Sequence, residues 1–214
     1  MKLLFITLVL VAASLSLWSC KKTSRVSFEE PKVERVCFTG DVMLSRGVAA
    51  IERKMGSDYL FSKIQPVLNR YNYRFINLEC PLTPLHYPPD KPYSFRADSS
   101  SVGILTSAGI THATLANNHI DDQTTAGAAD TYRILRDNGI AGLGLKTRDQ
   151  DTCKPAEITV GDRKIAVFTA LGIDMKSPNE WYCLDSLFIK SVGIYKKKSI
   201  GICYMLPALG DRIP

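Results

Sequence analysis

Three short polar clusters contain residue types that bind metal ions and transfer protons. Asp41 follows the apolar stretch VCFTG, Glu79 follows FIN, and the eight residues LANNHIDD at 115–122 include Asn118 and His119. Each cluster comes where a predicted strand ends. Because binding sites in open α/β sheets form at the carboxyl ends of the strands, we expect these side chains to converge in one crevice.

Carboxylate, amide and imidazole groups together suit Mn, Zn, Fe or Mg. Two such ions about 3.5–4 Å apart would hold a phosphoryl group and generate a hydroxide nucleophile. Each cluster taken alone also has a structural interpretation, since an aspartate after a strand often forms a turn and His119 could be a structural histidine. One of Asp121 and Asp122 is expected to be the N-cap of a helix that begins near Thr124. Three clusters at successive strand ends favour the metal-site interpretation over the structural one.

Short apolar stretches alternate with amphipathic ones, which predicts an α/β fold. Strands are expected at 35–40, 73–79, 110–116, 140–145 and 200–206, together with a hairpin at 156–171 that turns at Gly161-Asp162.

Helices are expected at 58–71, 99–109 and 125–139. The first places Leu60, Ile64 and Leu68 on one face despite Pro66. The second begins with serines, which are good capping residues, and both later helices end at a glycine.

The first twenty residues have the layout of a secretory signal, with Lys2 before the apolar stretch 3–11 and small or polar residues leading to Cys20. LWSC at 17–20 resembles a bacterial lipobox, although Trp18 replaces the usual small residue. The alternative is a plain signal peptide or a membrane anchor with an incidental cysteine. Residues 21–34 mix charge with Ser and Pro and are expected to be a flexible tether. We therefore expect a lipoprotein anchored in the bacterial cell envelope, outside the cytoplasm.

The formal charge of +6 is spread along the chain, which indicates a solvated surface, with attraction to an anionic polymer or lipid as the second interpretation. The sequence has no stripe of aromatic and basic residues, so a nucleic-acid partner is not expected. Five cysteines follow Cys20 without zinc-ligand spacing, and an odd number cannot all pair within the chain, so buried free thiols are expected.

FTGDVMLSRGV, FINLECPLTP, KPYSFRAD and AGITHATLANNHIDD follow one another between Val36 and Leu171. In this order they resemble the CapA family of capsule and poly-gamma-glutamate biosynthesis proteins, which is related to the calcineurin-like metallophosphoesterases. The resemblance implies a metallophosphoesterase-like layered sandwich with a mixed β-sheet. It also implies a divalent metal centre with one or two ions that acts on an anionic polymer or a phosphate-containing substrate within a capsule synthesis complex.

The resemblance also assigns a role to each matching residue. Asp41 is implied as a first metal ligand, Glu79 as the bridging carboxylate, Asn118 as a ligand to the second ion, and His119 as the catalytic group that contacts the oxyanion. Arg46 and Arg96 match positions suited to an anionic substrate, since a guanidinium group fits carboxylate or phosphate. Asp122 matches the acidic residue of the substrate-binding loop, but Thr124 stands where a glycine is usual.

The second half of the family normally supplies a His-Trp-Gly-x-Glu-Tyr motif and further histidines, whereas this chain contains only His86, His112 and His119. We therefore expect the domain at 35–214 to be incomplete, its metal centre to lack nitrogen ligands, and the apolar faces of 164–171 and 199–206 to be uncovered. The tail at 207–214 is hypothesised to be a frameshift product, because ALGDRIP can be encoded so that a one-nucleotide shift gives His-Trp-Gly-Ile-Glu-Tyr.

Two functional classes remain open from the sequence. One is a metallophosphoesterase-like enzyme of capsule or poly-gamma-glutamate assembly, and the other is a non-catalytic lipoprotein that binds an anionic polymer or a membrane complex.

The signal and lipobox lead to a test of the anchor. The mature protein is expected to partition into detergent, and Cys20→Ala is expected to lose this behaviour because it removes the lipidated side chain. Phase separation followed by immunoblotting measures both. A Cys20→Ala protein that partitions as before would show that the tether does not depend on lipid at Cys20.

Overall fold

The computed structural model describes residues 34–86, 92–145, 154–171, 186–198 and 200–205, all within the compact unit Val33–Pro214. Its first sheet is fully parallel, with the strand order β1-β2-β3-β4. The strands are β1 (Val36–Val42), β2 (Tyr73–Leu78), β3 (His112–Thr114) and β4 (Ala141–Leu143). Because the strands are parallel, their carboxyl ends meet at the same edge of the sheet.

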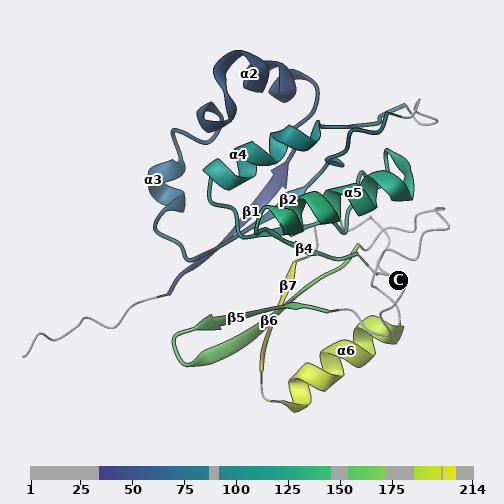
Figure 1. Ribbon diagram of the computed structural model, residues 1–214. Helices are drawn as coiled ribbons and strands as arrows, with labels where there is room; N and C mark the ends of the chain where they lie inside the picture. Colours follow the sequence, from purple (N-terminus) through teal and green to yellow (C-terminus); the bar gives the residue numbers. More distant parts are fainter. Residues whose placement is uncertain (1–33, 87–91, 146–153, 172–185, 199, 206–214) are drawn as a thin grey trace, which may run out of the picture. The chain divides into compact units, whose positions relative to one another are not determined.

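Helices cover one face of this sheet. Figure 1 shows α4 (Val102–Ser107) and α5 (Thr124–Asp137) lying along this face. A further helix, α2 (Gly47–Met55), precedes them in the chain. Ile76 and Ala113 on the strands are buried in one hydrophobic cluster with Ile104 of α4 and Leu135 of α5. Alternate residues of a strand point to opposite faces, so Phe75 belongs to a different cluster on the other side.

The second sheet packs against that other face. It contains β5 (Ala156–Val160), β6 (Arg163–Thr169) and β7 (Gly201–Met205), with β5 antiparallel and β7 parallel to β6. The expected hairpin at Gly161 is confirmed, and Gly161 has the positive φ of 63° that such a turn requires. The expected α/β class is also confirmed, but the described residues form two sheets, of which the first is parallel and the second is mixed.

The expectation of uncovered apolar faces on β6 is wrong. Phe168 packs against Phe188 of α6 (Ser186–Lys197), a helix that the sequence did not predict, while Val167 on the opposite face is buried with Phe75. The apolar pattern of 186–197 is weaker because three of its twelve residues are lysines.

The single helix predicted at 58–71 is also wrong. The structure has the 3₁₀ helix η1 (Ser57–Tyr59), consecutive turns, and the four-residue helix α3 (Gln65–Leu68). Pro66 lies in the first turn of α3, because proline lacks an N–H and its ring clashes with the preceding turn of a continuous helix. Leu68 is buried as expected, but Ile64 is 47% exposed.

The predicted helix ends are confirmed, and a serine, Ser101, is the N-cap residue of α4 as expected, but the predicted aspartate cap of α5 is wrong. Gly109 and Gly139 both adopt positive φ after α4 and α5. The serines at 99–101 form the 3₁₀ helix η2 before α4 without a side-chain cap, and Ser101 donates instead to Glu52. The N-cap of α5 is Gln123, so neither Asp121 nor Asp122 caps that helix.

Three of the cysteines after Cys20 are described, and all three are free thiols. Cys80 is buried and accepts a hydrogen bond from the Leu44 amide, and burial raises the pKa of its thiol to about 12. Cys37 and Cys203 are partly buried. Cys20, the predicted signal, the tether up to residue 33, and the tail at 207–214 lie outside the described residues.

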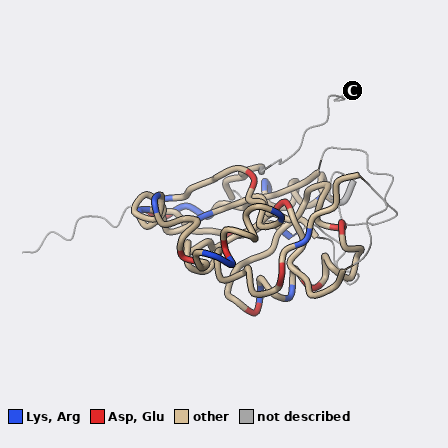
Figure 2. Tube along the Cα trace, turned by 90° about the horizontal axis from the view of Figure 1, so that it is seen from above, with Lys and Arg blue, Asp and Glu red and all other residues tan. Residues whose placement is uncertain are grey.

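Charged residues of both signs are spread over the described chain (Figure 2). Figure 2 shows acidic and basic residues interspersed along the described trace, as the spread of charge in the sequence predicted. None of the helices that the structure describes is long and apolar enough to cross a bilayer.

His112 gives the fold a pH-dependent contact. Its ring stacks on Phe75 with 4.2 Å between ring centroids, and burial lowers its pKa from 6.5 to about 4. Nδ1 lies 2.8 Å from the Thr111 hydroxyl. The neutral ring is therefore the form that the folded state favours.

We expect the free energy of unfolding to fall as the pH is lowered from about 6.5 towards 4, because the unfolded chain binds a proton that buried His112 resists. Urea titrations at several pH values measure this. His112→Phe should lose this part of the slope, and His86→Gln at an exposed histidine should keep it. Equal slopes for the native chain and His112→Phe would contradict the assignment.

Candidate functional site

The side-chain amide of Asn77 joins two of the predicted site carboxylates. Asn77 lies on β2, is 1% exposed, and pairs in register with Asp41 on β1. Its Nδ2 donates to Asp41 Oδ1 at 2.8 Å and also to Glu79 Oε1. The sequence analysis assigned no role to Asn77, although one asparagine inside the apolar strand YRFINL was a usable signal.

Asn117 links this pair to the loop that follows β3. It is fully buried, and its Nδ2 donates to Asn77 Oδ1 at 3.0 Å and to the Leu78 carbonyl at 2.8 Å. Its Oδ1 accepts from the backbone N–H of His119 at 3.1 Å. Asn117 therefore fixes the path of the loop that carries the predicted catalytic histidine.

His119 is oriented by Asp122. His119 Nδ1 lies 3.0 Å from Asp122 Oδ2, and the same oxygen accepts from the Phe95 amide at 2.6 Å. The Phe95 ring meets the imidazole edge-on at 4.6 Å between centroids. With Nδ1 on Asp122, Nε2 is the ring nitrogen available to a ligand, and the side chain is 19% exposed.

Arg46 contacts the Phe95 ring, as His119 does, and belongs to the same polar cluster, which we call the crevice after the sequence-based expectation. Its guanidinium lies 4.5 Å from the centroid of the Phe95 ring and 6.0 Å from that of Tyr93. Its φ of 55° lies in the left-handed region, which is unfavourable for a residue with a side chain. Strained backbone is characteristic of binding sites, where surrounding contacts hold it in place.

The hydrogen bonds of Arg96 lead away from this network. Arg96 donates to the Thr83 carbonyl at 3.1 Å and to Asp98 at 2.7 Å. Asn118 follows Asn117 in the chain and is half-buried. Its role as a metal ligand stays a prediction.

Glu79 carries the clearest electrostatic perturbation of the crevice. Burial raises the pKa of its carboxyl group, and the negative charges of Asp41 and Asp122 raise it further. The Asn77 hydrogen bond and His119 act in the opposite direction. These mutual effects place Asp41, Glu79, His119 and Asp122 in one electrostatic environment.

The described residues do not by themselves complete a metal centre. No group of three His, Cys, Asp or Glu side chains within the described ranges is arranged to hold an ion. Asp41 and Glu79 share the Asn77 amide, and His119 Nδ1 is bonded to Asp122. This donor set fits the implied dinuclear site poorly, because catalytic zinc sites commonly use three protein ligands.

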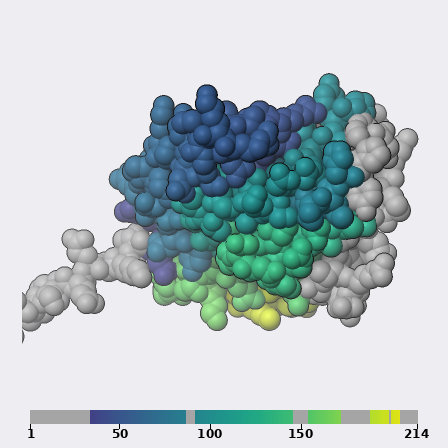
Figure 3. Space-filling model, turned by 45° about the horizontal axis from the view of Figure 1, so that its top comes forward, coloured from purple at the N-terminus to yellow at the C-terminus, as the bar shows by residue number. Residues whose placement is uncertain are grey.

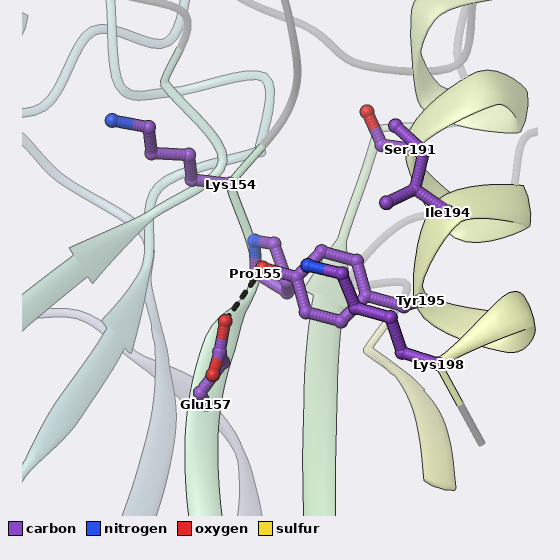
Figure 4. Close-up of a pocket in the computed structure, with 7 residues that line it drawn as sticks. All are labelled: Lys154, Pro155, Glu157, Ser191, Ile194, Tyr195 and Lys198. Carbon is purple, nitrogen blue, oxygen red and sulfur yellow. Dashed lines mark hydrogen bonds between the residues drawn. The ribbon is translucent and has the colours of Figure 1, made fainter. Parts of the chain in front are cut away.

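A separate cavity of about 400 Å³ lies between β5 and α6 and contains none of the predicted site residues. Figure 4 shows Tyr195 pointing towards Glu157, to which its hydroxyl donates at 2.7 Å, with Lys198 beside the ring. Burial, and then Glu157, raises the pKa of Tyr195 to about 12. The Tyr195–Glu157 bond connects α6 to β5.

The fold and crevice define a class of α/β protein whose polar site lies at the carboxyl ends of parallel strands. Comparison with known proteins then gives the family, because residues 35–188 match PGA_cap, the bacterial capsule synthesis protein family. The chain belongs to this family.

Two curated relatives match the same part of the chain. The capsule biosynthesis protein CapA of Bacillus anthracis is 28% identical over 152 residues, which cover 68% of this chain and 36% of the relative. The PGA biosynthesis protein CapA of Bacillus subtilis (strain 168) is 29% identical over 149 residues, which cover 67% and 39%. The matched region thus spans less than two fifths of either relative.

Removing the charge of Glu79 is expected to stabilise the protein near pH 7. A carboxyl pKa raised in the folded state favours folding below the unfolded value of about 4.3 and loses that contribution as the pH rises through the folded value. Glu79→Gln avoids this loss, so its advantage should disappear as the pH falls towards 4. Denaturant titrations at both pH values measure this.

Asp162→Asn, which neutralises an exposed aspartate in the β5–β6 turn, is the matched control and should show no such gain. A Glu79→Gln protein that is less stable than the native chain at pH 7 would contradict the assignment.

Proposed function

We propose that this chain is a lipid-anchored protein of capsule or poly-gamma-glutamate synthesis or export, located in the bacterial cell envelope. Family membership supports the process, and the predicted lipobox at Cys20 supports the location. Both relatives carry names of capsule or PGA biosynthesis proteins.

The crevice is proposed to bind one anionic group of the polymer or of a phosphate-containing precursor. The observation that carries this is the Arg46 guanidinium held over Phe95, whose ring also meets His119. A guanidinium supplies several donors in one plane, which fits carboxylate and phosphate oxygens. Phe95 and the strained backbone already restrict the conformations of Arg46, so Arg46 would lose less conformational entropy when a ligand binds.

His119 is the second ligand-binding group of this proposal. Asp122 accepts from Nδ1–H, so Nε2 donates to a bound oxyanion when both ring nitrogens carry a proton. Asp122 is accordingly a positioning residue, which differs from the direct substrate contact implied by resemblance. Arg96, bonded to Asp98, would act at most at the edge of the same surface.

A metallophosphoesterase-like hydrolase using Mn, Zn, Fe or Mg is the second candidate. It is favoured by the raised pKa of the Glu79 carboxyl group, since ionisable groups with perturbed pKa values are often found at functional sites. Metal analysis of the purified protein separates the candidates. Near-stoichiometric transition metal supports the hydrolase, and its absence supports a protein that only binds the polymer.

Arg46→Ala is expected to weaken binding of poly-gamma-glutamate about tenfold or more, because charged hydrogen bonds contribute about 1.5–3 kcal/mol. Calorimetric titration of the full chain measures this. Arg53→Ala, at an exposed arginine of α2, should bind within about twofold of the native chain. Equal affinities for the native, Arg46→Ala and Arg53→Ala proteins would overturn the role of Arg46.

A further inference from the structure

Exposed apolar side chains are concentrated before β2. Five of the ten large exposed hydrophobic residues in the described chain lie between positions 51 and 67. Tyr59, Ile64 and Val67 are 47%, 47% and 50% exposed. A concentration of this kind marks an interaction surface more often than isolated exposed residues do.

Lysine and arginine accompany these side chains. Consecutive hydrogen-bonded turns run from Tyr59 to Tyr71, so positions three or four residues apart lie on one side. Lys63, Ile64, Val67 and Arg70 share the exposed side, which we call the basic–apolar face, whereas Leu68 is 3% exposed on the core side. Residues 59–71 contain no aspartate or glutamate.

The start of the described chain lies beside this face. The backbone N–H of Arg35 donates to Asn72 Oδ1 at 3.0 Å, and the backbone N–H of Asn72 donates to the Arg35 carbonyl at 2.9 Å. Asn72 is two residues from Arg70. Figure 1 shows α3 on the side of the sheet where β1 begins, and in Figure 3 the blue segment that includes residues 51–70 forms part of the molecular surface.

We propose that the basic–apolar face docks on the anionic surface of the membrane that holds the tether. This inference rests on the envelope location in the proposed function. Apolar side chains enter the lipid interface, while lysine and arginine are attracted to anionic headgroups. The described chain begins next to this face, where Arg35 is hydrogen-bonded to Asn72, so a lipid anchor ahead of residue 34 would raise the effective concentration of lipid beside it.

The opposite ends of the strands carry the crevice. β1 and β2 begin near Arg35 and Asn72, whereas Asp41 and Glu79 lie at their carboxyl ends. Docking through the basic–apolar face would therefore point the crevice away from the lipid, towards polymer outside the membrane.

Hydrogen exchange of the full chain on vesicles tests the proposal. Vesicles of phosphatidylcholine with phosphatidylglycerol are compared with vesicles of phosphatidylcholine alone. Amides of residues 59–71 should exchange at least about threefold more slowly on the anionic vesicles, and amides of α6 should be unchanged. Lys63→Gln/Arg70→Gln should lose the protection, while Lys190→Gln/Lys197→Gln on α6 should retain it.

A second pair of variants tests the apolar contribution. Ile64→Ser/Val67→Ser should also lose protection, whereas Ile189→Ser, at a residue that is 73% exposed on α6, should not. Protection that appears without vesicles and grows with protein concentration would show contact with a second copy and overturn the proposal.

Failure of the docking can be distinguished from failure of the location. A chain that stays on vesicles while residues 59–71 exchange freely overturns the docking and leaves the envelope location intact. A chain that does not stay on vesicles at all overturns both, while polymer binding by Arg46 is measured independently in solution.

Discussion

The candidate site depends on one buried side-chain amide, that of Asn77. Its N–H group donates to Asp41 and Glu79, and its oxygen accepts from Asn117, so three successive chain segments converge on one residue. Register supports this contact, because Asp41 pairs with Asn77, which in turn pairs with Thr114. Two carboxylates near each other repel, and a shared donor offsets part of that cost. A side chain of the same size without a hydrogen-bond donor, such as leucine, could not make these two bonds.

The second sheet supports the same loop from the other side. The hydroxyl groups of Thr114 and Thr169 are hydrogen-bonded to each other, and this bond joins the end of β3 to the end of β6. Gly144, after β4, has a φ of 87°, and an added Cβ would lie 2.6 Å from the Ala116 side chain. Closely packed buried segments cannot shift independently of one another. The Asn117–His119 loop is therefore held in place by both sheets. Rigid support of this kind is what a binding site for a small charged group requires.

The sequence was most informative where a local pattern determines the structure. Strands around Phe75 and Ala113 and the glycine ends at Gly109 and Gly139 follow from alternation and positive φ, which are properties of a few consecutive residues. The asparagine within YRFINL marks Asn77 as unusual, but its partners Asp41 and Asn117, like the contacts of Phe95, depend on register and on the packing of distant segments, which no local pattern encodes. Asp122 shows the same limit, since its capping tendency was overridden by contacts with Phe95 and His119.

The parallel sheet also separates attachment from recognition. A strand of seven residues such as β1 spans roughly 23 Å at about 3.3 Å per residue, so its two ends cannot lie at one surface. Arg35, the second described residue, lies next to Asn72 at one end, and Asp41 lies beside Asn77 at the other. In the proposed arrangement, lipid contact at the first end leaves Arg46 and His119 accessible at the second. The direction of the strands, rather than the conformation of the tether, then determines which way the crevice faces.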